Sequence, residues 1–173
     1  MSTEDLIELF HYRWAPPALA LLGERGGARF VELQRRLEVG RESLRRALDT
    51  LIELGYVRPN IGYGHALRPE YVTTPAGRPA ALIAARVIAA GDSETLLRKW
   101  SVPVLAELGL ERRFSELRVA LAGVTPRALA LALQDLERTG YVQREVLATR
   151  PPSTLYRPTP AGRRVQRALE DGS

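Results

Sequence analysis

The stretch RWAPPALALLGERGGARFVELQRRL, residues 13–37, recurs later in the chain as KWSVPVLAELGLERRFSELRVAL, residues 99–121. Matching positions hold the pairs Trp14/Trp100, Pro17/Pro103, Leu19/Leu105, Gly23/Gly109, Phe30/Phe114 and Glu32/Glu116. The loop between the glycine and the phenylalanine is shorter in the second copy. Because the order of the matches is the same in both stretches, we interpret the chain as an internal duplication.

The duplication continues almost to the end of the chain. GYV at residues 55–57 recurs at 140–142, and TPAGR at residues 74–78 recurs intact at 159–163. Tyr71 has its counterpart in Tyr156. The sequence therefore predicts two domains of the same kind, one over residues 1–91 and one over residues 92–173.

Three helices are expected in the first part of each copy. Leu19 and Leu22 belong to the first helix, and the second extends from Phe30 to Leu37 at helical spacing. The third is expected from about Gly40 to Leu54, with its counterpart from Thr125 to Thr139. In it, Leu44, Leu48 and Leu51 are spaced to form one buried face. Gly55 and Gly140 then stand where a left-handed helix end is expected.

The rest of each copy predicts a two-stranded hairpin and a closing helix. One strand starts at the Tyr-Val pair of GYV, and the other holds Tyr71 or Tyr156. Thr-Pro then indicates a capped helix start, giving closing helices over residues 74–90 and 159–169. One more helix is expected around residues 6–10. The fold class is mainly α with small β-wings (α+β): two winged helix-turn-helix domains in tandem.

The second copy resembles the HxlR-type winged helix regulators, which are relatives of the MarR group. The resemblance covers about residues 96–169. It rests on Trp100, the run RFSEL at 113–117, Leu136-Glu137, Gly140, Pro151-Pro152, Tyr156, Thr159 and Gly162-Arg163. The first copy follows the same pattern more loosely.

The resemblance implies bacterial transcription control, with the third helix in the major groove of DNA and the wing on the backbone or minor groove. In that family two chains pair through their flanking helices. Because this chain holds two copies, we expect its flanking helices to pack as an intramolecular pseudo-dimer, with a homodimer as the other arrangement. The chain lacks the cysteine that some members use for sensing.

The third helix of the first copy has the residue types that read duplex DNA. Arginine can grip guanine through two hydrogen bonds or anchor a phosphate, and serine can donate to either. The candidate DNA-binding residues on this helix are Arg41, Glu42, Ser43, Arg45, Arg46 and Asp49. The alternative is a solvated charged face with pairs such as Glu42–Arg46 and Arg45–Asp49.

The third helix of the second copy has fewer polar groups. Only Thr125, Arg127 and Gln134 are candidate readers, beside Ala128, Ala130 and Leu131. Leu131 is expected to be exposed, which indicates either contact with protein or readout of thymine methyls and DNA shape. The alternative is a different helix phase or an intramolecular contact. The wings add candidate phosphate contacts: Arg58, Asn60, His65 and Arg68 in the first copy, and Arg144, Arg150 and Arg157 in the second.

Composition favours a nucleic-acid partner and disfavours catalysis. The net charge is +5, and the isoelectric point is about 10.1, as is typical of DNA-binding proteins. There is no cysteine, and the only histidines, His11 and His65, are far apart, so we expect no metal, no cofactor and no enzyme activity. No apolar run reaches membrane-spanning length, which favours a soluble, cytoplasmic, nucleoid-associated protein.

Two functions from different classes fit these observations. The first is a transcriptional regulator that binds double-stranded DNA. The second is a tandem winged helix module that binds protein, as in chromosome-segregation or transcription machinery. The arginines of the first third helix favour DNA, and the apolar third helix of the second copy favours protein. Steep weakening of duplex binding by salt would support the first function.

Overall fold

A computed structural model describes residues 1–60, 70–150 and 152–170. His65 and Arg68 lie outside these residues. The first half (residues 1–91) holds α1 (Thr3–Leu9), α2 (Ala15–Arg25), β1 (Ala28–Arg29), α3 (Phe30–Leu37), α4 (Arg41–Glu53), β2 (Val57–Asn60), β3 (Glu70–Thr73) and α5 (Gly77–Ala89). The second half (residues 92–173) holds α6 (Ser93–Leu96), α7 (Ser101–Leu108), β4 (Arg112–Arg113), α8 (Phe114–Ala120), α9 (Pro126–Arg138), β5 (Val142–Leu147), β6 (Ser153–Pro158) and α10 (Pro160–Glu170).

Each half contains a small antiparallel sheet with the same topology. The strand orders are β1-β3-β2 and β4-β6-β5. The expected two-stranded hairpin is confirmed in each half. A third strand was not predicted; it forms because the residues before α3 and α8 are extended and pair with the hairpin. Ala28 is the partner of Tyr71, and Arg112 is the partner of Tyr156. The aromatic residues that recur between the copies therefore lie at the same place in each sheet.

The third helices α4 and α9 begin and end as expected. Gly40 precedes α4, and the Thr125 hydroxyl accepts a hydrogen bond from the Ala128 amide at the start of α9. Gly55 and Gly140 follow with φ of 72° and 80°, a backbone conformation that favours glycine. In α4 the predicted face of Leu44, Leu48 and Leu51 is buried.

The recurring GYV and TPAG segments touch each other in both halves. The Thr74 hydroxyl donates to the Gly55 carbonyl at 2.6 Å, and the Thr159 hydroxyl donates to the Gly140 carbonyl at 2.6 Å. Each hydroxyl also accepts from a glycine amide, that of Gly77 at 3.0 Å or Gly162 at 3.2 Å. This GYV–TPAG contact links the start of the hairpin to the closing helix.

The same contact explains the glycine in TPAG. A Cβ at Gly77 would overlap the carbonyl oxygen of Tyr56, and a Cβ at Gly162 would overlap that of Tyr141. The helix can approach the backbone this closely only without a side chain.

Some expected boundaries were shifted. The closing helix α5 begins at Gly77 and not at Thr74, because the Thr74 hydroxyl holds a turn before the helix. The N-terminal helix covers Thr3–Leu9, slightly earlier than expected. The short helix α6 was not predicted; its N-cap is Asp92, whose carboxylate accepts from the amides of Glu94 and Thr95.

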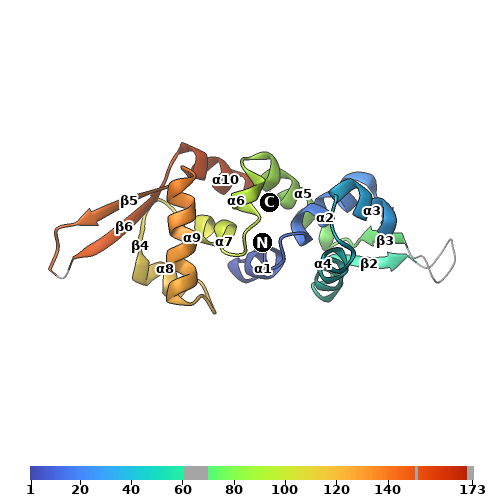
Figure 1. The fold of residues 1–173 in the computed structure, drawn as a ribbon, viewed down its shortest axis with the longest axis horizontal. Helices are drawn as coiled ribbons and strands as arrows, with labels where there is room; N and C mark the ends of the chain where they lie inside the picture. The colour runs from blue at the N-terminus through green and yellow to red at the C-terminus, as the bar shows by residue number, and fades with distance from the viewer. Residues whose placement is uncertain (61–69, 151, 171–173) are drawn as a thin grey trace.

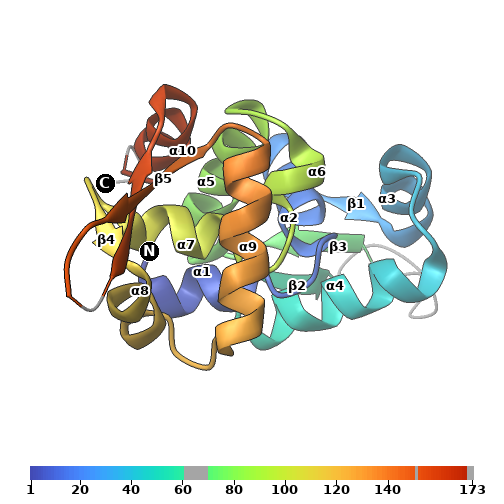
Figure 2. The same ribbon diagram turned by 60° about the vertical axis from the view of Figure 1, so that its left-hand side comes forward.

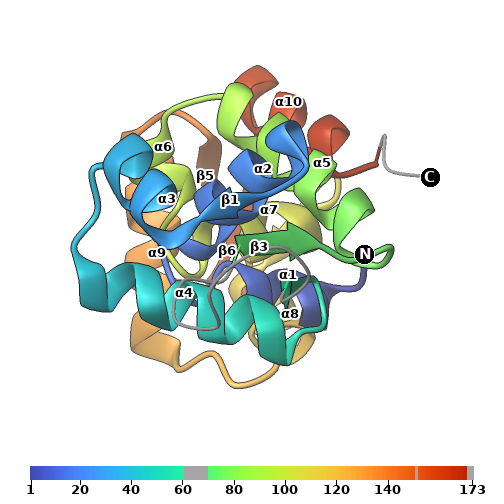
Figure 3. The ribbon, with the colours of Figure 1, turned by 90° about the vertical axis from the view of Figure 1, so that its right-hand side faces the viewer.

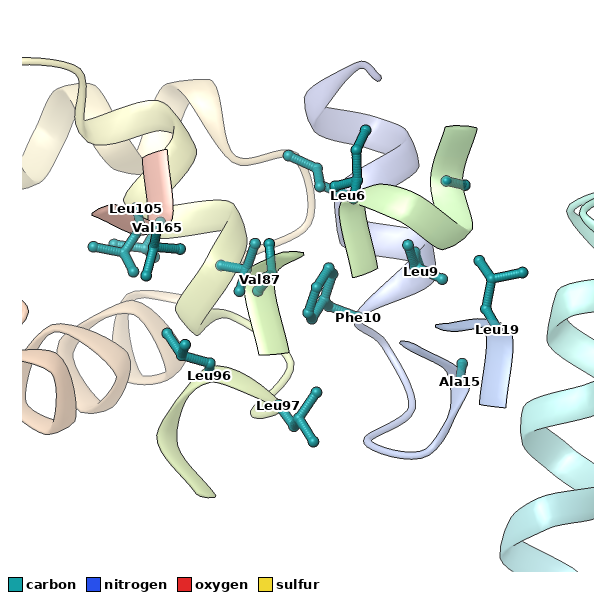
Figure 4. Packing of buried hydrophobic residues seen from close by; sticks show 14 of the residues in the cluster. Leu6, Leu9, Phe10, Ala15, Leu19, Val87, Leu96, Leu97, Leu105 and Val165 are labelled. Carbon is teal, nitrogen blue, oxygen red and sulfur yellow. The ribbon is translucent and has the colours of Figure 1, made fainter. Parts of the chain in front are cut away.

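The two sheets lie at opposite ends of an elongated molecule, and the flanking helices lie between them (Figure 1). Helix α5 packs against α2 and against α10 of the second half, and α1 packs against α7. The buried side chains form one cluster that continues from the first half into the second (Figure 4). Polar contacts also cross the junction, such as the Thr3 hydroxyl with Glu107 and Arg13 with Glu94.

Candidate nucleic-acid interface

The outer face of α4 carries all six of its candidate DNA-binding residues. Leu44, Leu48 and Leu51 are buried on the inner face. Arg41, Glu42, Ser43, Arg45, Arg46 and Asp49 are exposed. The side chains of Arg45 and Arg46 are 66% and 64% exposed, so their guanidinium groups have room to meet a ligand. The amphipathic spacing of the sequence is what separates the two faces.

Glu42 forms ion pairs with two arginines of this face. Its carboxylate lies 3.2 Å from Nε of Arg46, the pair expected at that spacing. Arg45 also approaches Glu42, with Nε at 3.6 Å, and the expected pair of Arg45 with Asp49 was wrong. Pairs as exposed as these contribute little to stability. The guanidinium of Arg41 lies over the ring of Phe30, 5.8 Å from its centroid, which orients it beside the start of α4.

The outer face of α9 is less polar. Arg127, Ala130 and Gln134 are exposed, and Leu131 is 53% exposed, as expected from the sequence. The Thr125 hydroxyl caps the helix by accepting from Ala128 at 3.1 Å. Its oxygen is therefore committed to the helix, while its proton can still be donated.

The wing candidates differ in their exposure and in their hydrogen bonds to other residues of the protein. Arg58, Arg144 and Arg150 are exposed, whereas Asn60 donates to Glu70 at 3.1 Å. His65 and Arg68 lie outside the described residues.

Arg157 is held on the second wing by two carboxylates. Its Nε lies 2.8 Å from Glu111, and its Nη1 lies 2.8 Å from Glu145. The hydrogen bond to Glu111 and the charge of Glu145 raise the pKa of Arg157. Its positive charge is thus balanced locally, which makes it a weaker candidate for phosphate contact than Arg144 or Arg150.

The candidates form separate groups rather than one site. The α4 group belongs to the first half and the α9 group to the second, and the wings lie at the two ends of the molecule (Figure 1). Helix α4 lies along the lower side of the molecule in Figures 2 and 3, while α5, α6 and α10 lie along the upper side. Helix α4 therefore lies on the side of the molecule away from α5, α6 and α10.

Further exposed arginines flank the candidates and were not predicted. Arg35 and Arg36 lie in the last turn of α3, and Arg118 lies in the last turn of α8. The helix before a recognition helix crosses the DNA backbone in helix-turn-helix proteins. Basic residues at the end of the predicted second helix were the signal that could have identified them.

Other kinds of site find little support in the described part of the chain. There, no group of three or more His, Cys, Asp or Glu side chains could hold a metal ion. None of the helices within residues 1–60, 70–150 and 152–170 is both long and apolar enough to cross a membrane.

A helix pair, a third helix with an exposed outer face and a hairpin beside it define a winged helix-turn-helix protein. Residues 95–171 match the HxlR-like helix-turn-helix family. The second half of the chain is therefore similar to that family, which confirms the resemblance drawn from the sequence.

Similar proteins agree with this assignment. An HTH-type transcriptional regulator of Synechocystis sp., described as uncharacterized, is 39% identical over 77 residues, covering 44% of this chain and 57% of the relative. The uncharacterized HTH-type transcriptional regulator YtfH of Escherichia coli is 38% identical over 68 residues, covering 39% of this chain and 54% of the relative. The chain thus spans little more than half the length of these two relatives.

A crystal structure described as a MarR-family transcriptional regulator from Enterococcus faecalis is also similar. It is 34% identical, with a TM-score of 0.44, and the match covers 49% of this chain and 76% of that protein.

Proposed function

We propose that this chain is a transcriptional regulator that binds double-stranded DNA. The observation that carries the proposal is the outer face of α4. Arg45 and Arg46 are exposed there, on the helix that corresponds in position to the recognition helix of helix-turn-helix proteins. The HxlR-like match of residues 95–171 supports it, as does the net charge of +5. A location in the cytoplasm, on the nucleoid, would follow.

We further propose that residues 1–91 and 92–173 are two winged helix domains that pack as an intramolecular pseudo-dimer. The recurring order of elements supports two domains. The packing of α1 on α7 and of α5 on α10 supports the pseudo-dimer, because each contact joins a helix of one half to a helix of the other. One chain would then present two third helices to one stretch of duplex.

In this proposal the candidate residues divide by role. Base edges and nearby phosphates are contacted by Arg41, Ser43, Arg45 and Arg46. Glu42 and Asp49 affect which base is preferred. The wing residues Arg58, Arg144 and Arg150 anchor phosphates, which supports affinity rather than sequence choice.

The salt dependence of binding to a random duplex tests the proposal. Binding measured by fluorescence anisotropy should weaken steeply with salt, because each neutralised phosphate releases counterions. The double variant Arg45→Ala with Arg46→Ala should bind more weakly. The slope of log K against log salt is negative, and in this variant its magnitude should fall by about one for each phosphate that is no longer neutralised.

A matched control removes the same charge elsewhere. Arg164 and Arg167 are exposed on α10, which lies along the side away from α4 (Figure 2). Arg164→Ala with Arg167→Ala should leave the slope unchanged. If the unmodified chain does not bind duplex even at low salt, the proposal is refuted and the protein-binding alternative gains support.

A further inference from the structure

The helices α4 and α9 share one framework, so their outer faces can be compared position by position. Leu44, Leu48 and Leu51 of α4 are buried, and so are Leu129, Leu133 and Leu136 of α9. Both helices have thirteen residues, and each is followed by a glycine with positive φ. The same offset that relates the buried leucines therefore relates the exposed positions.

At those exposed positions the two helices offer different chemistry. Arg45 corresponds to Ala130, and Arg46 corresponds to Leu131. Ser43, which is exposed, corresponds to the partly buried Ala128. The middle of the α4 face thus presents two guanidinium groups, whereas the middle of the α9 face presents methyl groups only.

This difference decides which base edges each helix can read. A guanidinium can donate two hydrogen bonds to O6 and N7 of guanine, the most common specific contact in the major groove. Alanine and leucine have no donor or acceptor and can only contact the methyl group of thymine. At these positions α4 can therefore discriminate strongly among bases, and α9 only weakly.

The second half still has the means to bind the DNA backbone. Arg127 on α9 is exposed, as are Arg144 and Arg150 on the second wing. Contacts of this kind provide affinity without sequence information. Gln143 of the second wing takes the position that Arg58 has in the first.

We infer that the chain recognises a directional operator: a guanine-containing half-site read by α4, next to a segment that the second half holds through phosphates and thymine methyls. This inference rests on the proposed function. A symmetric pair of equal readers would select a palindrome, whereas this pair selects one specified half-site with a loosely specified flank.

Selection of duplexes from a random pool tests the inference. The unmodified chain should enrich one non-palindromic motif. Arg45→Ala with Arg46→Ala should no longer enrich the motif, with affinity for it falling ~10-fold or more relative to random duplex. Arg127→Ala with Gln134→Ala should keep the motif and bind all sequences more weakly.

A graft of the missing side chains gives a second, independent test. Ala130→Arg with Leu131→Arg places the guanidinium groups of α4 at the matching positions of α9. This variant should enrich an inverted repeat, with half-site centres about one helical turn apart or a multiple of it. Leu82→Arg with Leu110→Arg, at positions 58% and 84% exposed, adds the same charge outside α4 and α9. This control should leave the motif unchanged.

The outcomes separate the inference from the proposed function. A palindromic motif from the unmodified chain overturns the inference while leaving DNA binding intact. An unchanged single half-site from the graft also overturns it, because positions 130 and 131 would then not face base edges. If no duplex is retained by any variant, the proposed function itself fails and the inference fails with it.

Discussion

Removing the hydroxyl of the GYV–TPAG contact should destabilise either half by a similar amount. In Thr159→Val the side chain keeps its shape but loses the hydrogen bonds to the Gly140 carbonyl at 2.6 Å and from the Gly162 amide at 3.2 Å. Each such bond contributes about 1 kcal/mol net, so the free energy of unfolding should fall by about 2 kcal/mol. For a chain of this size, that corresponds to a drop in Tm of roughly 4–8 °C.

Thr74→Val should have a similar effect, because its hydroxyl makes the equivalent bonds at 2.6 and 3.0 Å. Thermal denaturation followed by circular dichroism, with urea midpoints as a check, measures both variants. Thr159→Ser and Thr74→Ser keep the hydroxyl and serve as controls that should be destabilised much less. If both valine variants melt within about 1 °C of the unmodified chain, these hydrogen bonds do not stabilise the fold and the reasoning is wrong.

Three further perturbations follow from the structure. Gly162→Ala should lower the free energy of unfolding by about 1–3 kcal/mol in urea titrations, because its Cβ would overlap the Tyr141 carbonyl; a neutral effect would contradict the close approach. The hydrogen bond from the Thr95 hydroxyl lowers the pKa of Asp92 in the folded chain. The stabilisation from the ionised Asp92 is therefore present above the unfolded pKa and is lost as the pH falls through the folded pKa. The Tm of the unmodified chain should therefore fall more steeply below about pH 4 than that of Asp92→Asn, and parallel curves would refute this. Leu131→Glu should weaken binding to duplexes of every sequence through repulsion of phosphates, and unchanged anisotropy titrations would show that α9 lies away from the DNA.

The sequence predicted most of the fold because its repeated residues have local structural roles. The spacing of Leu44, Leu48 and Leu51 and the positions of Gly55 and Gly140 follow from helix geometry alone. The strands β1 and β4 could not be predicted in the same way, because a two-residue strand has no pattern of its own and exists only through its partner. The shifted start of α5 depends on where the Thr74 hydroxyl binds, which is a tertiary contact.

In the candidate interface, too, some features follow from the sequence and others depend on tertiary contacts. Exposure of the α4 arginines followed from the helical period, so the sequence was sufficient. The two carboxylates beside Arg157 come from Glu111 and Glu145, which only the folded sheet brings near it. The contact of Arg41 with Phe30 likewise joins two helices. Sequence patterns therefore indicated which side chains are available, and the structure showed which are already paired.

The packing of α1 on α7 joins parts of a single chain, and this affects how the occupancy of a target depends on the concentration of the protein. Two separate subunits must meet before they can act, so their joint occupancy of a target falls with the square of their concentration when copies are scarce. Covalent linkage fixes the local concentration of one half around the other, whatever the number of molecules in the cell. Dilution therefore cannot separate the two halves. Under the proposed function, occupancy of a DNA target by single chains should rise in proportion to their concentration while copies are scarce.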